Sequence, residues 1–318
     1  MHSTQQGGPA PIPLDVIVIG ESLIDIVKKS TTTIGYPGGS PANVAYGLGR
    51  LGIPTGLLTA IGNDAHGDTI TRHIESAGVQ ILPGSHSLEK TATATATLTA
   101  DGSASYEFDI TWQLAAVTPD TIPKIVHTGS IATFLEPGAS RVRTLLQQCH
   151  QDCMVTYDPN IRPALLGSHH EAKNLFEELV QLTDVVKLSD EDANWLYPSM
   201  DLGDVATHIL KLGARLAVIT KGAQGSLLAT PETRVNIPSQ KTVVADTIGA
   251  GDAYMSALIM ALLANPAADI STGVLEHLGR TASIAAAITV GRPGANPPTS
   301  EELHMELAGT RPNPFAAV

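Results

Sequence analysis

The chain has 318 residues, 43% of them apolar and only 4% aromatic. It is long enough for one large domain or two smaller ones, with a core built mainly from Ala, Val, Ile and Leu. A formal charge of −12 opposes nonspecific binding to nucleic acid or to anionic membranes, and no apolar run is long enough to span a bilayer. We expect the two cysteines, Cys149 and Cys153, to be reduced and structural in a cytoplasmic protein.

Residues 1–13 lack the basic and apolar regions of a signal peptide and are expected to form a flexible lead-in. Strands and helices then alternate, which predicts an α/β fold with a parallel sheet wrapped by helices. The expected strands are 15–20, 55–61, 125–128, 154–158, 185–188 and 216–220. The expected helices are 42–51, 65–77, 139–150, 170–182, 202–212, 250–263 and 274–290.

One region departs from this alternation. Residues 91–98 read TATATATL, a strict period of two, and a turn at Asp101-Gly102 separates them from a second candidate strand at 103–110. This pattern predicts an antiparallel hairpin, expected in a small separate sheet. The alternative is an edge hairpin that only packs against the main sheet.

A first glycine motif, GGSPAN at 38–43, leads into the predicted helix at 42–51. Pro41 suits the first helical turn, and the amide of Asn43 can both donate to and accept from hydroxyl groups. The following GLGRLG at 47–52 fits a dinucleotide-binding pattern. It lies within a helix rather than between a strand and a helix, so we interpret it as close helix packing.

A second glycine motif, DTIGAGD at 246–252, precedes the Ala-rich helix at 250–263. The amides of Gly249, Ala250 and Gly251 are expected to face outward at its N-terminus, where unpaired donors and the helix dipole suit a phosphate or an oxyanion. Asp252 lies beside this anion site, and a carboxylate there suits the handling of a proton or a hydroxyl. The motif therefore indicates phosphoryl transfer to an alcohol. The alternative is that Asp252 is only a helix cap or a dipole partner.

Together the two motifs resemble the signatures of the ribokinase-like (PfkB) sugar kinases, over about residues 16–307. The resemblance implies a three-layer α/β/α kinase domain at 14–318 with a mostly parallel central sheet. It also implies a small β-sheet lid formed around 31–38 and 91–112, and a homodimer contact through that lid. The implied reaction is ATP-dependent phosphorylation of a primary hydroxyl of a small sugar. Asp252 would be the base that orients this hydroxyl, with a pKa lowered by the helix N-terminus.

On the acceptor side, the resemblance assigns sugar contacts to Asp25, Gly39, Asn43, Asp158, Asn160 and Arg162. Without it, Asp25 is equally well a solvated charge at the end of a strand. The segment YDPNIRP at 157–163 resembles that of fructokinase-like and ketodeoxygluconate-kinase-like members. Arg162 either contacts the sugar or the transferred phosphoryl group, or it holds its own loop by pairing with Asp158.

On the nucleotide side, the resemblance assigns ATP contacts to Lys187, Ser189, Thr220, Gly222, Gly225, Ala285 and Thr289. The family motif Asn-x-x-Glu, which organises Mg²⁺ through waters, reads Ser189 to Asp192 here. Either Glu191 or Asp192 takes that role, and the competing interpretation is a solvated acidic helix start. A monovalent cation, K⁺, would be held by Asp246, Ile248, Thr289, Arg292 and Gly294. Alternatively, Asp246 only caps its loop.

The expected partners are a small sugar and ATP, with no nucleic acid and no membrane. Fructose is the leading acceptor, and ribose, 2-keto-3-deoxygluconate or a nucleoside are alternatives. A sugar phosphate is disfavoured because no Arg/Lys cluster adjoins the sugar motifs. The rival from another class is a non-catalytic sugar-binding regulator on the same scaffold. The altered magnesium motif slightly favours this rival, whereas Asp252 and its Gly-Ala-Gly loop oppose it.

Overall fold

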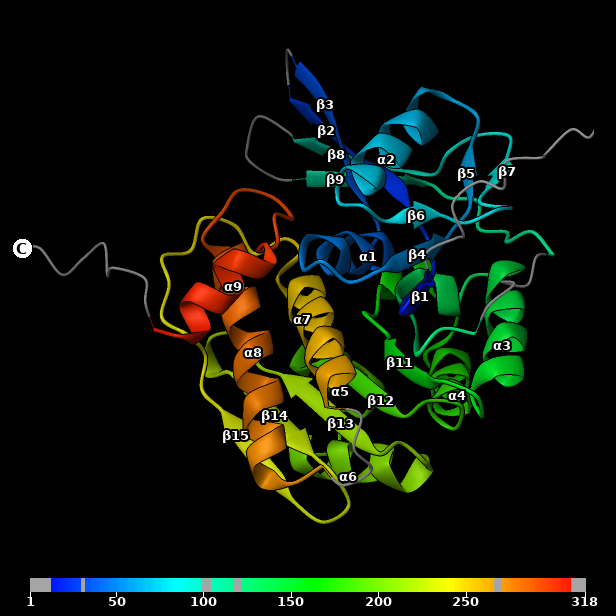
Figure 1. The fold of residues 1–318 in the computed structure, drawn as a ribbon. Coiled ribbons are helices and arrows are strands. Elements are labelled where there is room, and N and C mark those ends of the chain that lie inside the picture. Colours follow the sequence, from blue (N-terminus) through cyan, green and yellow to red (C-terminus); the bar gives the residue numbers. More distant parts are fainter. Residues whose placement is uncertain (1–12, 30–31, 99–103, 117–121, 266–269, 310–318) are drawn as a thin grey trace, which may run out of the picture.

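The computed structural model describes residues 13–29, 32–98, 104–116, 122–265 and 270–309. Most of the expected lead-in at 1–13 and the Asp101-Gly102 turn lie outside these residues. A nine-stranded sheet forms the centre of the molecule, in the order β15-β14-β13-β12-β11-β10-β1-β4-β6 (Figure 1). Its strands are β1 (Val16–Ile19), β4 (Thr55–Leu58), β6 (Gln80–Ile81), β10 (Ile125–Gly129), β11 (Met154–Asp158), β12 (Val185–Ser189), β13 (Leu216–Thr220), β14 (Ser226–Ala229) and β15 (Arg234–Ile237).

All pairs in this sheet are parallel except β13–β14 and β14–β15. The predicted, mostly parallel sheet is therefore confirmed, with an antiparallel edge that the sequence did not indicate. Helices α3 (Gly138–Cys149), α4 (His169–Val180), α5 (Asp190–Leu196) and α6 (Leu202–Leu212) cover one face. Helices α1 (Ser40–Arg50), α2 (Ala65–Ser76), α7 (Ala250–Ala264) and α8 (Thr272–Val290) cover the other, and α9 (Ser300–Leu307) packs on α8.

The alternation along β1 shows why the sheet lies between two helical layers. Ile17 and Ile19 belong to the core shared with α3, α4 and α6, whereas Val16 and Val18 belong to the core shared with α1, α7 and α8. Successive strand residues point to opposite faces, so an uninterrupted apolar strand is buried on both. The three-layer α/β/α arrangement that the sequence implied is confirmed.

A second sheet of four strands, ordered β3-β2-β8-β9, stands apart from the first (Figure 1). Its strands are β2 (Leu23–Lys29), β3 (Thr32–Gly38), β8 (Thr93–Leu98) and β9 (Ala104–Asp109). The predicted hairpin is confirmed as the antiparallel pair β8–β9, and β2 joins it in parallel. The strand predicted at 55–61 is shorter than expected. It ends at Leu58, and β5 (Ile61–Gly62) pairs instead with β7 (His86–Leu88).

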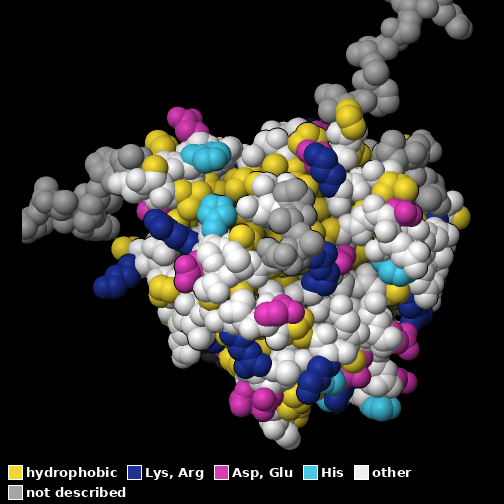
Figure 2. All heavy atoms as spheres, turned by 60° about the horizontal axis from the view of Figure 1, so that its bottom comes forward, with side chains coloured by type: hydrophobic (Ala, Val, Ile, Leu, Met, Phe, Trp, Pro, Cys, Tyr) yellow, Lys and Arg dark blue, Asp and Glu magenta, His cyan; other side chains and the backbone are white. Residues whose placement is uncertain are grey.

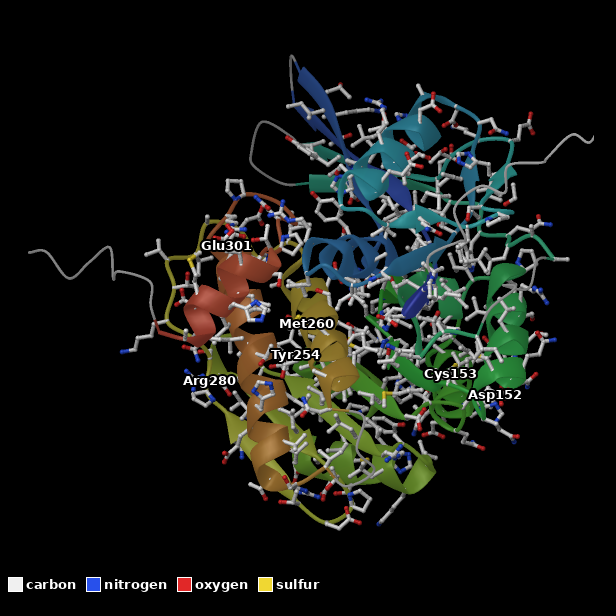
Figure 3. All side chains as sticks on the ribbon, viewed as in Figure 1. Asp152, Cys153, Tyr254, Met260, Arg280 and Glu301 are labelled. Atoms are coloured by element: carbon white, nitrogen blue, oxygen red, sulfur yellow. The ribbon has the colours of Figure 1, made fainter. Side chains whose placement is uncertain are left out.

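Charged side chains of both signs are scattered over the face in Figure 2, without a patch of one sign. Among the described residues, no helix has both the length and the hydropathy needed to cross a membrane. Cys149 and Cys153 are both free thiols. Cys153 lies just before β11, apart from α7 and its Tyr254 in Figure 3.

Candidate active site

A cleft of about 1270 Å³ opens between the main sheet and the four-stranded sheet. Asp158, Ser189 and Thr220 line it from the last residues of β11, β12 and β13. Parallel strands bring their carboxyl ends to one edge of a sheet, and ligands of α/β proteins bind outside that edge. The opposite wall includes Asp25 and Phe108 from the four-stranded sheet. The cleft is large enough for two small-molecule substrates.

The second glycine motif forms the floor of this cleft at the N-terminus of α7. Gly249 is the N-cap residue and has a φ of 74°, the left-handed conformation that favours glycine. A Cβ on Gly249 would lie 2.7 Å from that of Ala295, so the loop leaves no room for a side chain. The amide of Ala250 donates to the carbonyl of Thr247 at 3.3 Å. The amides of Gly251 and Asp252 lie in the first turn of α7, where an amide has no carbonyl partner within the helix.

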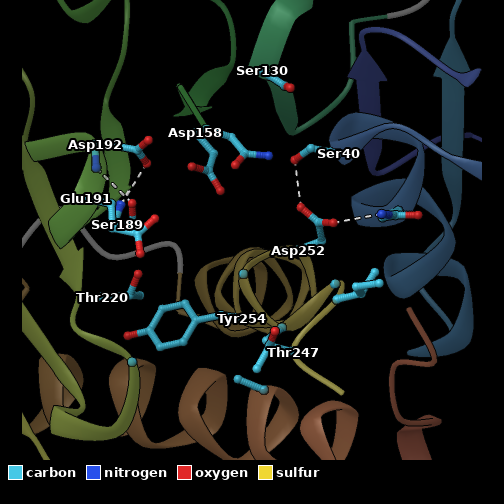
Figure 4. A pocket seen from close by; sticks show the side chains of 18 of the residues that line it. Ser40, Ser130, Asp158, Ser189, Glu191, Asp192, Thr220, Thr247, Asp252 and Tyr254 are labelled. Carbon is cyan, nitrogen blue, oxygen red and sulfur yellow. Dashed lines mark hydrogen bonds between the residues drawn. The ribbon is translucent and has the colours of Figure 1, made fainter. Parts of the chain in front are cut away.

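Asp252 is 8% exposed and lines the cleft from the first turn of α7. Ser40 Oγ donates to its Oδ1 at 2.6 Å, and Asn43 Nδ2 donates to its Oδ2 at 2.8 Å (Figure 4). The carboxylate makes no capping hydrogen bond to its own helix, so Asp252 is not a helix cap, although it keeps a first-turn position beside the helix dipole. It also links the two glycine motifs, because Ser40 and Asp252 lie 212 positions apart in the chain.

The expectation of a lowered pKa for Asp252 is wrong in direction. Burial raises the pKa of Asp252, and the hydrogen bonds from Ser40 and Asn43, together with the charges of Lys187 and Arg162, only oppose this effect. The sequence suggested the helix N-terminus but gave no measure of how much of the carboxylate is removed from water. A buried base with a raised pKa is better suited to accepting a proton than an exposed one.

Asp158 and Lys187 form a buried ion pair, with 2.6 Å between Oδ2 and Nζ. Among the described residues, no ion pair joins Arg162 to Asp158. Arg162 donates from Nη1 to the carbonyl of Ile161 at 3.0 Å and holds its own loop in that way. Lys187 Nζ would lie only 3.6 Å from a Cβ on Gly251, so the ammonium group sits beside the predicted anion site. Burial raises the pKa of Asp158 to about 6, although Lys187 opposes the shift.

The altered magnesium motif begins α5 as a capping box. Ser189 Oγ accepts from the amide of Asp192 at 3.0 Å, and Asp192 Oδ2 accepts from the amide of Ser189 at 3.0 Å. The other oxygen of Asp192 accepts from the amide of Ile161 at 2.8 Å, so both oxygens hold backbone groups. Glu191, by contrast, is exposed and lines the cleft. Of the two candidates, only Glu191 presents a carboxylate that is free to reach a ligand through water.

The predicted sugar residues meet at the other end of the cleft. Asp25, Gly39, Asn43, Asn160 and Arg162 all line it. Gly39 has a φ of 100°, and a Cβ there would come within 2.5 Å of the carbonyl oxygen of Glu21. The carboxylate of Asp25 lies against Gly38, where a side chain would collide with it. The first glycine motif is thus held against the segment that follows β1.

Two residues of this end were not predicted. Glu21 is only 3% exposed, and its Oε2 accepts from the amide of Ala132 at 3.1 Å. Burial raises the pKa of Glu21 to about 8. Ser130 also lines the cleft and has a φ of 54°, an unusual conformation for a residue other than glycine and one often found at functional sites. Glu21 and Ser130 follow the carboxyl ends of β1 and β10, which are neighbouring parallel strands. A polar residue directly after a predicted parallel strand is the signal that could have identified both.

Thr220, Gly222 and Gly225, which the resemblance assigns to ATP, line the cleft. Ala285 and Thr289 do not line it; both are fully buried, and the hydroxyl of Thr289 donates to the carbonyl of Ala285. Positions four apart lie on one face of a helix, and this face of α8 turns into the core. The residues of α8 that line the cleft are Ser283, Ala286, Ala287 and Val290.

Asp246 holds two loops together. Its Oδ1 accepts from the amide of Ile248 at 3.1 Å, and its Oδ2 accepts from the amide of Gly294 at 2.9 Å. These two bonds are what the loop-capping alternative for Asp246 expects. They also bring together Ile248 and Gly294, two of the residues predicted to hold a monovalent cation. The side chain of Arg292 binds Glu302 at 2.6 Å. Within the described residues, no group of three or more His, Cys, Asp or Glu side chains could hold a metal ion.

Comparisons with known proteins agree with this geometry. Residues 14–302 match the model of the pfkB family carbohydrate kinases. A fructokinase of Rhizobium leguminosarum bv. trifolii is 31% identical over 259 residues, which cover 78% of this chain and 79% of the relative. Among solved structures, a fructokinase from Xylella fastidiosa with bound ATP superposes with a TM-score of 0.81 at 23% identity, covering 93% and 99% of the two chains. A sugar kinase from Pyrococcus horikoshii in complex with ATP gives 0.74 at 28% identity, covering 90% and 96%.

Proposed function

The chain belongs to the pfkB family of carbohydrate kinases and is an ATP-dependent carbohydrate kinase, and we propose that its acceptor is a primary hydroxyl of a small uncharged sugar, with fructose the first candidate. The observation that carries the proposal is the buried carboxylate of Asp252, which faces the cleft between the two glycine motifs.

Asp252 is the base in this proposal. It receives the proton of the acceptor hydroxyl and holds the oxygen in line with the γ-phosphorus of ATP. The amides of Gly249 and Gly251 at the start of α7 stabilise charge on the transferred group, while the amide of Ala250 donates to the carbonyl of Thr247 and holds the loop. The nearby ammonium of Lys187 adds a positive charge to the same place, supported by its closeness to Gly251. The nucleotide lies along Thr220, Gly222 and Gly225, with its base against Ala286 and Ala287 of α8.

Magnesium chemistry fits the residues of the cleft. Asp158 Oδ1 is buried in the cleft wall and has no hydrogen-bond partner, while Glu191 is exposed to the cleft. These are the two carboxylates that would organise a hydrated Mg²⁺, which neutralises charge on the phosphates when bound. Asp192 has the structural task of joining α5 to the loop of Arg162. K⁺ near Asp246 stays a prediction from the sequence.

The acceptor is proposed to be uncharged because carboxylates dominate its end of the cleft. Asp25, Asp252 and the protonated carboxyl of Glu21 line that end beside Arg162, while the other described cations of the cleft are Lys187, which pairs with Asp158, and Lys241, which follows β15. A second phosphate or a sugar acid would meet these carboxylates without a cluster of cations to offset them. Ribose and nucleosides remain alternatives that this pattern of charge does not disfavour.

The four-stranded sheet is proposed to be the lid, and a homodimer is proposed to form through it. Ile34 and Tyr36 on β3 and Phe108 on β9 are 49%, 53% and 41% exposed. Tyr36, Asp25, Ala94 and Phe108 are consecutive cross-strand partners, so their side chains share the face that borders the cleft. An apolar face of this kind is suited to covering a sugar or a second chain.

The test is sugar-dependent release of ADP across a panel of neutral sugars, sugar phosphates and sugar acids, with Mg²⁺ and K⁺ present. We predict that Asp252→Asn lowers kcat by about 10²- to 10⁴-fold, because the acceptor loses its base. Binding of the sugar, measured by calorimetry, stays within a few-fold of wild type. Asp204→Asn is the matched control, because Asp204 is exposed at the same position in the first turn of α6. Absence of ADP release with every acceptor would refute the proposal.

A further inference from the structure

Ser40 is the residue of the first glycine motif with the closest contact to Asp252. It is the first residue of α1 and is 8% exposed. Its hydroxyl lies 2.6 Å from Oδ1 of Asp252, a short distance typical of a hydroxyl donating to a charged carboxylate. Asn43, three positions later on the same face of α1, binds the other oxygen. The first turn of α1 thus holds the whole carboxylate (Figure 4).

A close contact between α1 and α7 fixes this arrangement. A Cβ on Gly47 would come within 2.5 Å of the hydroxyl oxygen of Ser256, so the side chain of Ser256 packs directly against the backbone of α1 at this glycine. Gly47 lies one turn after Asn43 on α1, and Ser256 lies one turn after Asp252 on α7. The hydroxyl and the carboxylate are therefore carried on two helices that pack closely against each other just beyond the site.

We propose that Ser40 is a positioning residue for phosphoryl transfer: its hydroxyl holds Oδ1 of Asp252 in the orientation that receives the acceptor hydroxyl and keeps this carboxylate ionised inside the cleft. The proposal rests on the proposed function of the same site. Because the single hydroxyl proton of Ser40 is committed to Asp252, the oxygen of Ser40 can only accept from a ligand. The serine thus acts on the reaction through the base.

Other charged groups face Asp252 and remain when Ser40 is changed. Lys187 from β12 and Arg162 from the loop after β11 favour the ionised carboxylate. Asp158 at the end of β11 and Glu21 at the end of β1 interact with it as like charges. These four groups are the same in the wild type and in Ser40→Ala, so the difference between the two pH profiles reports the loss of the Ser40 hydroxyl even where Asp158 and Glu21 change their own charge.

The experiment is the pH dependence of kcat/KM for the best sugar in the wild type and in Ser40→Ala. Loss of a hydrogen bond to a buried carboxylate should move the acidic limb of the profile up by about one pH unit. On the acidic limb, below the wild-type midpoint, we expect kcat/KM to fall about tenfold, with recovery to within about threefold at pH 9 and little change in the KM of the sugar. Ser40→Thr keeps a hydroxyl and should restore the wild-type limb.

Ser22→Ala is the matched control, because Ser22 is also buried but its hydroxyl oxygen accepts from the hydroxyl of Thr59 instead of donating to Asp252. Its profile should keep the wild-type limb. A loss in Ser40→Ala that is the same at every pH, or a limb that does not move, would overturn the proposal.

A second measurement separates failure of this inference from failure of the proposed function. Free energies of unfolding are compared for Ser40→Ala, Asp252→Asn and the double variant. Coupling between the two sites supports the contact in a protein of any activity, whereas additive effects overturn it. If the wild-type protein shows no sugar-dependent release of ADP, the proposed function is refuted. The coupling between Ser40 and Asp252 in the free energy of unfolding is still measurable in that case.

Discussion

Glu21 shows what burial does to a single carboxyl group in this protein. Burial raises its pKa to about 8, from 4.5 for an unburied glutamate. The folded chain therefore keeps a proton that the unfolded chain has lost between these two pH values. The stabilising contribution is complete below about pH 4.5 and disappears as the pH rises to about 8.

We predict that Glu21→Gln removes this part of the pH dependence. Glutamine keeps the acceptor that binds the amide of Ala132 and cannot ionise. In the wild type, this one group lowers the free energy of unfolding by up to about 1.4 kcal/mol per pH unit in that window. Urea unfolding of both proteins at pH 5, 6, 7, 8 and 9 measures the difference. Parallel curves for the two proteins would show that Glu21 is ionised throughout.

At this scale the sequence indicated some residues and not others. Asp252 was found because it ends a specific motif beside a helix start. Ser40 lies within the other motif, but its role depends on a contact across 212 positions of the chain, which no local pattern encodes. Glu21 has no motif at all. The direction of the pKa shift of Asp252 was missed for the same reason, since burial is a property of the packed molecule.

Among the elements, the loop before α7 depends on one backbone conformation. Gly249 has a φ of 74°, and a Cβ there would press on Ala295 at 2.7 Å. We predict that Gly249→Ala lowers kcat at least tenfold with a smaller change in the KM of the sugar, because the amides of α7 are displaced from the transferred phosphoryl group. The left-handed conformation alone costs about 1–2 kcal/mol of stability. Steady-state kinetics and urea unfolding measure both effects.

Gly78→Ala separates the two causes. Gly78 has a φ of 78° after α2, but a Cβ there would meet nothing within 4 Å. It should lose similar stability and keep the wild-type kcat. An equal loss of activity in both variants would mean that destabilisation, rather than displaced amides, explains the effect at Gly249.

Elements with a clear period and clear ends were predicted well. Strand β11 at 154–158 and helix α6 at 202–212 have the predicted bounds. The antiparallel strands β14 and β15 are only four residues each and were missed, as was β2, whose partner β8 lies far along the chain. Helix α5 has seven residues, too few for a period to show, so the sequence predicted neither its bounds nor its capping box. Ala285 and Thr289 were predicted to contact ATP, but α8 is rotated about its axis so that both side chains are buried in the core.

At the scale of the whole molecule, the cleft lies between the nine-stranded sheet and the four-stranded sheet. Ile34 on β3 pairs with Val27, two positions from the pair of Tyr36 and Asp25, so Ile34 and Tyr36 share the face that borders the cleft. The sequence predicted one hairpin of this second sheet, but not how its apolar face lies relative to the sugar residues. The position of this face depends on the chain crossing from one sheet to the other between β1, which belongs to the nine-stranded sheet, and β2, which belongs to the four-stranded sheet.

This arrangement joins association of two chains to sugar binding. If two chains associate through the four-stranded sheets, the contact also holds each sheet over its cleft. We predict that Ile34→Glu converts a dimer to a monomer in analytical ultracentrifugation, because a charge would be buried in an apolar contact. The KM of the sugar should then rise several-fold while kcat changes little, since Asp252 and α7 belong to the other side of the cleft. Ile122→Glu, a change at another exposed isoleucine outside this sheet, should leave both mass and KM unaltered.

A wild-type chain that sediments as a monomer at micromolar concentration would contradict the proposed dimer. A rise in KM in the monomeric variant at every protein concentration, but in the wild type only on dilution, would show that the second chain keeps the cleft covered.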